Sequence, residues 1–122
     1  MNKFGIKVGD LFVAEWGYDQ TNTTFFQVVK LCGKESVRVR EVFPQMIEEK
    51  PVGKMAADRK YEVPNELLPP SKHSVFIKDQ GKGDLKRLKS FTIDGTNPKF
   101  SIGSYADAYL YHGEECYESW YA

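Results

Sequence analysis

The chain has 122 residues, of which 41% are hydrophobic and 28% are charged, and its 17 Lys/Arg balance 17 Asp/Glu. This length fits one domain over residues 1–122, and eight Phe, seven Tyr and two Trp can bury a core, which excludes a disordered chain. The balanced charge argues against a polybasic nucleic-acid-binding protein. No apolar run approaches the roughly 20 residues of a membrane span, and the first residues lack a secretory signal, so we expect a soluble, cytoplasmic protein without membrane contact.

The first third of the chain has the composition of β-strands. Runs rich in β-branched and aromatic residues predict strands at 11–16, 25–32 and 36–43. In the third run Val37 and Val39 alternate with arginines, so we expect both valines to face a core. Because the connections are short, the three strands are predicted to form an antiparallel meander, and its exposed edges favour closure with later strands.

The middle of the chain, residues 44–70, is interrupted by five prolines. This composition predicts an elaborated irregular loop that crosses the sheet, and loops of such length often carry function. Within it we expect at most one or two turns of helix, over residues 55–60, which are too short to be stable alone.

The second half of the chain returns to strand character. Apolar and β-branched residues predict strands at 74–78, 89–93 and 99–102, with turns at 81–83 and 94–98. The tail over residues 106–121 is predicted to form a hairpin around His112 and Gly113, since both residue types tolerate a turn. The alternative is a helical turn over residues 105–111 with Ser104 as its N-cap.

Together these elements predict a mainly β fold. We expect a single small, twisted antiparallel sheet that closes into an SH3-like or partly open barrel, with a long irregular middle loop. The expected core includes Leu11, Val13, Val28, Val37, Val39, Val75, Ile77, Ile93 and Ile102.

Nothing in the sequence predicts catalysis or a metal site. Cys32 and Cys116 are 84 residues apart, which does not resemble a disulfide framework, so we expect both to be reduced. His73 and His112 are the only imidazoles, and neither stands in a nucleophile, oxyanion or metal-ligand motif. We therefore expect a protein that is not an enzyme and holds no metal and no cofactor.

Charge is segregated along the second half of the chain. Residues 67–100 carry seven Lys/Arg and three Asp/Glu, a net charge of +4, whereas residues 101–122 carry four Asp/Glu and no Lys/Arg. One interpretation is a basic face over residues 78–99 that attracts a charged partner, with a rim formed by Lys82, Lys86, Arg87 and Lys89. The other interpretation is a solvated surface whose neighbouring strands offset one another's charge.

The most distinctive segment is residues 16–22, with the sequence W-G-Y-D-Q-T-N. Two large aromatic residues beside a flexible glycine suit a recognition loop, in which Trp16 and Tyr18 supply contact area and Gln20 and Asn22 supply directional hydrogen bonds. A narrower version is an aromatic cage for a cationic side chain. The structural alternative is that Trp16 and Tyr18 close one end of the barrel.

The same segment carries a resemblance. Residues 9–12, 16–22 and 25–29, with the pattern W-G-Y-D-Q-T-N…F-Q-V, together with the aromatic-rich residues 109–113 and 117–121, resemble a signature of small proteins encoded by phages and other bacterial mobile elements. The resemblance covers most of the chain and implies a genomic setting. It brings no catalytic residues.

From this setting and the composition we expect a non-enzymatic binding module that engages a host protein in the host cytoplasm. One such partner is a host defence nuclease, inhibited in an anti-CRISPR-like manner. Under this hypothesis Trp16, Tyr18, Gln20 and Asn22 contact the partner, and the basic rim steers it. The alternative is a nucleic-acid-binding accessory protein that makes weak, salt-sensitive contacts through its basic 78–99 face.

Overall fold

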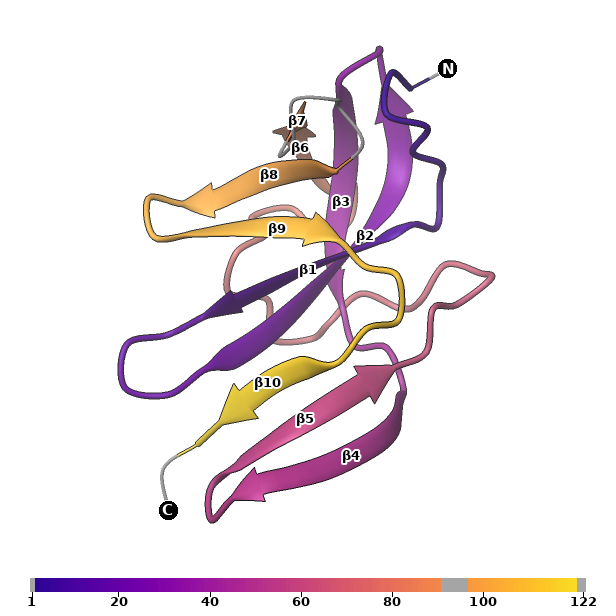
Figure 1. Cartoon of the computed structure of the whole chain (residues 1–122). Coiled ribbons are helices and arrows are strands. Elements are labelled where there is room, and N and C mark those ends of the chain that lie inside the picture. The colour runs from indigo at the N-terminus through magenta and orange to yellow at the C-terminus, as the bar shows by residue number, and fades with distance from the viewer. Residues whose placement is uncertain (1, 91–96, 121–122) are drawn as a thin grey trace.

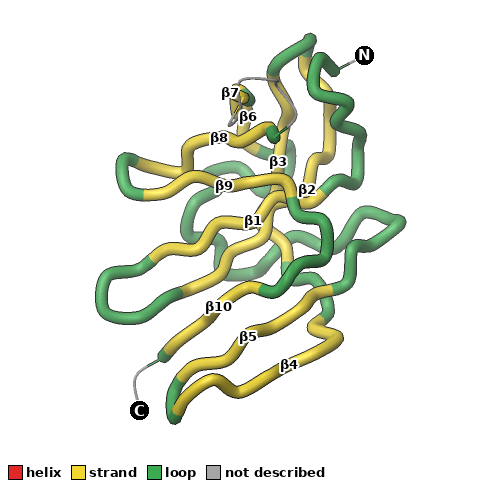
Figure 2. The backbone as a smooth tube through the Cα atoms, viewed as in Figure 1, coloured by secondary structure: helices red, strands yellow, loops and turns green. Residues whose placement is uncertain are grey.

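The computed structural model describes residues 2–90 and 97–120, and these form strands joined by turns and loops (Figures 1 and 2). In chain order the described strands are β1 (Leu11–Trp16), β2 (Asn22–Cys32), β3 (Ser36–Val42), β4 (Met46–Gly53), β5 (Ala56–Tyr61), β6 (Asp84–Arg87), β7 (Lys89–Ser90), β8 (Pro98–Gly103), β9 (Ala106–Leu110) and β10 (Cys116–Ser119). Within this part of the chain no helix is long and apolar enough to cross a bilayer.

Seven strands form one antiparallel sheet in the order β6-β3-β2-β1-β9-β8-β7. The predicted meander β1–β2–β3 is its centre, and the later strands extend both edges. The two end strands, β6 and β7, are separated in sequence by Leu88 alone, so the sheet curls back on itself and leaves one seam without a β-ladder. The predicted mainly β fold with a partly open barrel is therefore confirmed.

The curl has a local origin in the longest strand. Residues 22–27 of β2 pair with β1, whereas residues 25–32 pair with β3, and the register with β3 shifts between Val28 and Lys30. Such a bulge increases strand twist and bends the sheet. Strand β2 thus pairs mainly through its first half with β1 and through its second half with β3, and the bend between the two halves curls the sheet.

Aromatic residues fill the inside of the barrel. The ring of Phe12 lies 5.2 Å from that of Phe100, which lies 5.4 Å from Phe26, in tilted and edge-to-face arrangements. Aliphatic side chains from β2 and β3 complete this inner core, including Val28, Val37 and Val39. Val37 and Val39 of β3 therefore face inward, as their period-2 pattern predicted.

A second sheet, in the order β10-β5-β4, covers part of the outer face of the barrel. Strand β10 lies beside β1 and β2 (Figure 1). Between the two sheets is a second core, made of Leu11, Phe25, Val42, Tyr111 and Cys116. Because successive side chains of a strand point to opposite faces, one face of β1 and β2 contributes to the inner core and the other face contributes to the second core. The outer face of β9 and β8 is not covered by this sheet.

The middle of the chain differs from the expected irregular loop. Strands β4 and β5 form a hairpin over residues 46–61, and residues 55–60 are extended and contain no helix. Strand β5 is fixed on both sides, by β4 and by β10. Residues 44–45 and 62–69 have no regular secondary structure, and Pro70 forms an isolated β-bridge with Val42.

The predicted strand at 74–78 is wrong. This segment is a loop held by the buried carboxylate of Glu41, which accepts hydrogen bonds from the Ser74 hydroxyl at 3.1 Å and the Phe76 backbone N–H at 3.0 Å. Val75 points outward and is 70% exposed, although it was expected in the core, whereas Ile77 is buried. Single apolar side chains of this run therefore pack against the end of the barrel, and the run itself pairs with no strand.

The tail forms strands, but the expected hairpin is wrong, and so is the alternative helical turn. Strand β9 pairs with β1 and β8, whereas β10 pairs with β5 in the other sheet. Gly113, at φ +93°, lies in the connection between them. The tail therefore links the two sheets, because each of its strands finds a partner distant in the sequence.

The remaining expectations have mixed outcomes. Of the expected core, Leu11, Val28, Val37, Val39 and Ile77 are buried, and Val13 and Ile102 are half-buried against the two cores. The expected strand 89–93 begins as β7 at Lys89–Ser90. Ile93, the rest of that strand and most of the turn at 94–98 lie outside the described residues. Both cysteines are free thiols, as expected.

Candidate functional site

Beside the edge of the second sheet, the outer face of the barrel presents alternate residues of β1 and β9. Phe12, Ala14 and Ala108 point into the barrel, so their neighbours point outward. Val13 stands opposite Tyr109 in the β1–β9 ladder and therefore lies on the same outer face. Glu15 follows one pleat further along β1. This pairing brings together residues from the two ends of the sequence.

Trp16 is the last residue of β1, and its side chain makes internal contacts that hold the site in place. Its Nε1 donates a hydrogen bond to Thr24 Oγ1 at 2.8 Å, and its ring meets the Phe76 ring edge-on at 5.1 Å. Phe76 in turn contacts Phe26 of the inner core. Trp16 thus closes one end of the barrel, which is the structural alternative considered for this residue.

The loop after Trp16 is tightly built. Gly17 adopts φ +129°, and a Cβ at this position would lie 1.9 Å from the carbonyl oxygen of Gln20, so only glycine fits. The Gln20 side-chain amide donates to Asn22 Oδ1 at 3.1 Å within the loop. The backbone of Thr21 exchanges hydrogen bonds with Ser119 of β10, at 2.8 and 3.0 Å. Gln20 and Asn22 therefore shape the loop.

Tyr18 lies at the tip of this fixed loop and is 100% exposed. Tyr105, in the turn between β8 and β9, is 63% exposed, and its ring lies 6.4 Å from that of Phe76. Of the four residues predicted in the contact loop, the structure thus leaves Tyr18 fully available and holds Trp16, Gln20 and Asn22 in internal contacts.

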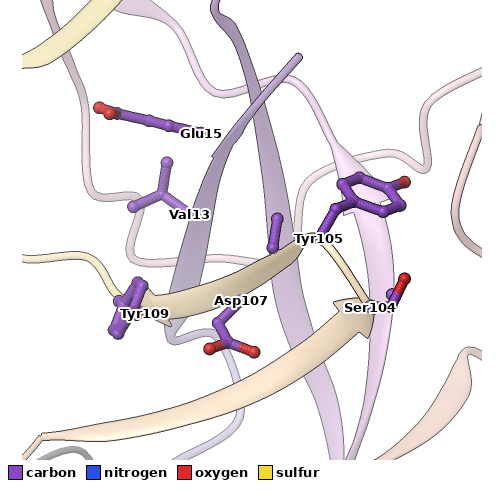
Figure 3. A pocket seen from close by; sticks show the side chains of 8 residues that line it. Val13, Glu15, Ser104, Tyr105, Asp107 and Tyr109 are labelled. Atoms are coloured by element: carbon purple, nitrogen blue, oxygen red, sulfur yellow. The ribbon is translucent and has the colours of Figure 1, made fainter. Parts of the chain in front are cut away.

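Two hollows open on this surface. The first, of about 570 Å³, lies over β1 and the β8–β9 turn (Figure 3). The second, of about 380 Å³, lies beside the loop that carries Tyr18. Glu15 and Tyr105 line both hollows. We refer to Val13, Glu15, Tyr18, Tyr105 and Tyr109 together as the tyrosine face.

The carboxylates near the tyrosine face differ in their partners. Asp107 forms an ion pair with Lys99 at 2.9 Å, and the Lys99 ammonium lies 5.9 Å from the centre of the Tyr109 ring. Glu118 accepts a hydrogen bond from the Tyr61 hydroxyl and lies 3.5 Å from Arg59.

Glu15 is different. Burial raises its pKa above the usual value, a hydrogen bond from the Tyr117 backbone opposes this, and the nearby carboxylates of Glu118 and Asp58 raise it further. Within residues 2–90 and 97–120, no Lys or Arg forms an ion pair with Glu15.

The basic rim predicted from the sequence is spread over several surfaces. Lys82 lies in the turn before β6, and Lys89 lies on β7. Lys86 and Arg87 are consecutive on β6 and therefore point to opposite faces. Arg87 forms an ion pair with Glu35 at 3.2 Å.

Two lysines that the sequence analysis did not single out lie at the same end of the barrel as Arg87. Lys3 also forms an ion pair with Glu35 at 3.2 Å, and its backbone N–H donates to the carbonyl of Lys34 at 2.7 Å. The N-terminal segment, the β2–β3 turn and β6 meet there (Figure 1). The basic end is defined here as Lys3, Lys34 and Arg87.

Groups that serve as nucleophiles or metal ligands in other proteins are dispersed. Burial and neighbouring carboxylates raise the pKa of the Cys116 thiol to about 12, so it stays protonated at neutral pH. His73 and His112 are both exposed. In the described part of the chain no three His, Cys, Asp or Glu side chains are grouped so that they could hold a metal ion.

No protein-family model matches the chain, and neither a curated protein nor a solved structure matches it significantly. The interpretation of the site therefore rests on its own geometry. The resemblance of residues 16–22 to proteins of mobile elements stays a prediction.

The sequence analysis missed most of the tyrosine face. Glu15 precedes the distinctive motif, Tyr109 stood in the tail expected to be a hairpin over residues 106–121, and Tyr105 directly precedes that tail. The available signal was alternation: residues 107 and 109 stand between apolar neighbours, which marks them as outward on a strand. Their partner strand could not be read from the sequence.

Proposed function

We propose that the protein is a non-enzymatic binding module that engages a protein partner through the tyrosine face. The observation that carries the proposal is the complete exposure of Tyr18 on a loop held by the Gly17 turn and by hydrogen bonds to β10. A large aromatic side chain gains free energy when it is removed from water, and tyrosine is enriched among the residues that dominate protein interfaces.

The construction of the loop supports this proposal. A contact residue on a flexible loop loses conformational entropy when it binds, which weakens the complex. Tyr18 avoids part of this loss, because Trp16 anchors one end of the loop and Thr21 anchors the other. Tyr105 and Tyr109 extend the contact area with further rings that are partly exposed.

The proposed partner is a host protein in the bacterial cytoplasm. The resemblance to proteins of phages and mobile elements supports this setting, in which small binding proteins often act on host factors. Inhibition of a host defence nuclease, in an anti-CRISPR-like manner, is the specific form of the proposal.

The experiment is capture from a bacterial host lysate with immobilised protein, followed by mass spectrometry and a binding measurement on the purified partner. Tyr18→Ala should weaken binding by about 10-fold or more, as expected for a central aromatic contact. Because the Tyr18 side chain is fully exposed, its removal should leave the fold intact.

Phe43→Ala is the matched control, since Phe43 is 74% exposed and lies in a different cavity of the molecule. It removes a comparable ring and should leave binding unchanged. Equal affinity of the wild type and Tyr18→Ala would refute the proposal, and loss only in Phe43→Ala would place the interface elsewhere.

A second candidate function is nucleic-acid binding at the basic end. The specific observation is that Lys3 and Arg87 share the single carboxylate of Glu35, with Lys34 adjoining them. Binding of a labelled single strand should then fall steeply with salt, and less steeply in Lys34→Ala and Arg87→Ala. No binding at low salt would remove this candidate.

A further inference from the structure

We infer that the tyrosine face receives an arginine or lysine side chain of its protein partner, held between the Glu15 carboxylate and the Tyr105 ring. This inference rests on the proposed function and names the chemistry of the partner. It is carried by the shape of the face, by the charge of Glu15 and by two similar arrangements in the same molecule.

The two hollows of the tyrosine face adjoin at one place. The two hollows have only Glu15 and Tyr105 in common among their lining residues, so these two side chains lie where the hollows adjoin. Figure 3 shows Glu15 on one side of the first hollow, together with Val13 and Tyr109, and Tyr105 on the other side. A long side chain with an apolar stem and a charged end fits such a space, since its stem can lie over Val13.

The same combination of carboxylate, aromatic ring and cation occurs twice nearby. Lys99 contacts Asp107 and lies over the Tyr109 ring. On the second sheet Arg59 pairs with Glu118, and its guanidinium lies 5.0 Å from the Trp120 ring. In both cases the cation comes from the chain itself.

Glu15 and Tyr105 are a further carboxylate and ring that line the same two hollows, and in the described part of the chain no Lys or Arg forms an ion pair with Glu15. The carboxylates of Glu118 and Asp58 lie close enough to disfavour the negative charge of Glu15, and burial acts in the same direction. A cation placed at Glu15 would offset all of these effects. A neutral hydrogen-bond donor would offset them only in part, and an anionic side chain would add to the repulsion.

Arginine fits better than lysine. Its planar guanidinium pairs with a carboxylate and stacks on an aromatic ring at the same time, whereas an ammonium group is more strongly hydrated. We therefore expect an arginine peptide to bind more tightly than the corresponding lysine peptide.

The inference is tested by nuclear magnetic resonance titration of the whole protein with acetyl-Gly-Arg-Gly-amide. The matched probe is the same peptide with citrulline, which keeps the shape of arginine and lacks its charge. Arginine peptide at millimolar concentration should shift the amide signals of Val13, Glu15, Tyr105 and Ala106, and citrulline peptide should not. Absence of localised shifts, or equal shifts with both peptides, would overturn the inference.

Glu15→Gln should weaken binding of the arginine peptide by about five-fold, the value of a partly exposed charge pair. Gln retains an oxygen that can accept the Tyr117 hydrogen bond, so the fold should persist. Glu48→Gln removes the same charge from exposed strand β4 and should have no effect. Unchanged affinity in Glu15→Gln, or an equal loss in Glu48→Gln, would overturn the inference.

The same variants separate this inference from the proposed function. If Tyr18→Ala abolishes capture of the partner while Glu15→Gln binds it normally, the protein-binding function stands and the cationic contact is wrong. If neither substitution weakens the partner complex, both proposals fail. If both substitutions weaken it and the arginine peptide competes with the partner, both are supported.

Discussion

Gln27 is the buried polar residue whose replacement should affect the fold most clearly. It lies on β2 and is fully buried. Its Nε2 donates to the carbonyl oxygens of Gly9 at 3.1 Å and Glu66 at 2.9 Å, and its Oε1 accepts from the Leu68 N–H at 2.7 Å. One side chain thus attaches the irregular segment 62–70 to the barrel.

Gln27→Met keeps the length of the side chain and removes all three hydrogen bonds. At about 1 kcal/mol for each bond, the free energy of unfolding should fall by about 3 kcal/mol. This is a large share of the roughly 5 to 15 kcal/mol that holds a domain of this size folded, and Tm should drop by about 10 °C. Urea unfolding followed by tryptophan fluorescence measures the change.

Gln45→Met is the control, because the Gln45 side chain is exposed and the substitution keeps the Gln45 backbone carbonyl, which accepts a hydrogen bond from the Glu62 N–H at 2.8 Å. It should alter the unfolding free energy by less than about 0.5 kcal/mol. A loss below about 1 kcal/mol in Gln27→Met would show that the three bonds contribute little net stability. Faster hydrogen exchange at the Leu68 amide should accompany the expected loss.

Three further predictions concern the site and the thiols. Gly17→Ala should cost about 2 kcal/mol or more in thermal unfolding, because of its positive φ and the contact with the loop backbone, whereas Gly53→Ala, with open space around it, should not. Cys116 should resist alkylation at pH 8, since burial raises its pKa to about 12, and the half-buried Cys32 should react first, as mass spectrometry would show. Glu15→Gln should be more stable than the wild type at pH 7, and chemical unfolding should show this difference closing as the pH falls through the raised pKa of Glu15, because protonation then removes the same charge.

The first three strands were predictable because their information is local. Strand β1 has the predicted bounds, and β3 begins at the predicted residue. In β3 the alternation of Val37 and Val39 with arginines reports directly which face is buried. A pattern of this kind needs no knowledge of the rest of the chain.

The hairpin β4–β5 could not be predicted in this way. Every residue of β4 is exposed, so the strand has no apolar face and no period-2 signal. In the sequence, Pro51 also suggests an irregular segment. In the structure, Pro51 and two register shifts lie in β4, and prolines and bulges are normal features of an edge strand. Strand β5 is stabilised by β10, which lies far away in the sequence.

The loop at 74–78 shows the opposite error. Its apolar residues satisfy the composition of a strand, but the Glu41 carboxylate takes the backbone N–H groups of Val75 and Phe76 that a strand would use for pairing. Nothing near these residues in the sequence reveals that acceptor. The strand propensity of this segment is therefore outweighed by hydrogen bonds to a residue that is distant in the sequence.

The residues of the candidate site differ in the same way, since one was recognisable from local sequence and the others were not. Tyr18 was recognised because aromatic residues beside a glycine are unusual in a short connection, whereas Glu15, Tyr105 and Tyr109 gain meaning only through the pairing of β1 with β9. That pairing also explains why the face is open. The second sheet buries Leu11 and Phe25 on the outer side of β1 and β2, and it ends at β10, so the outward residues of β9 stay partly exposed. A chain that had to cover this surface for stability alone would place apolar residues there. This chain places tyrosines and a carboxylate without an ion-pair partner among the described residues, which are side chains suited to contact with a second molecule.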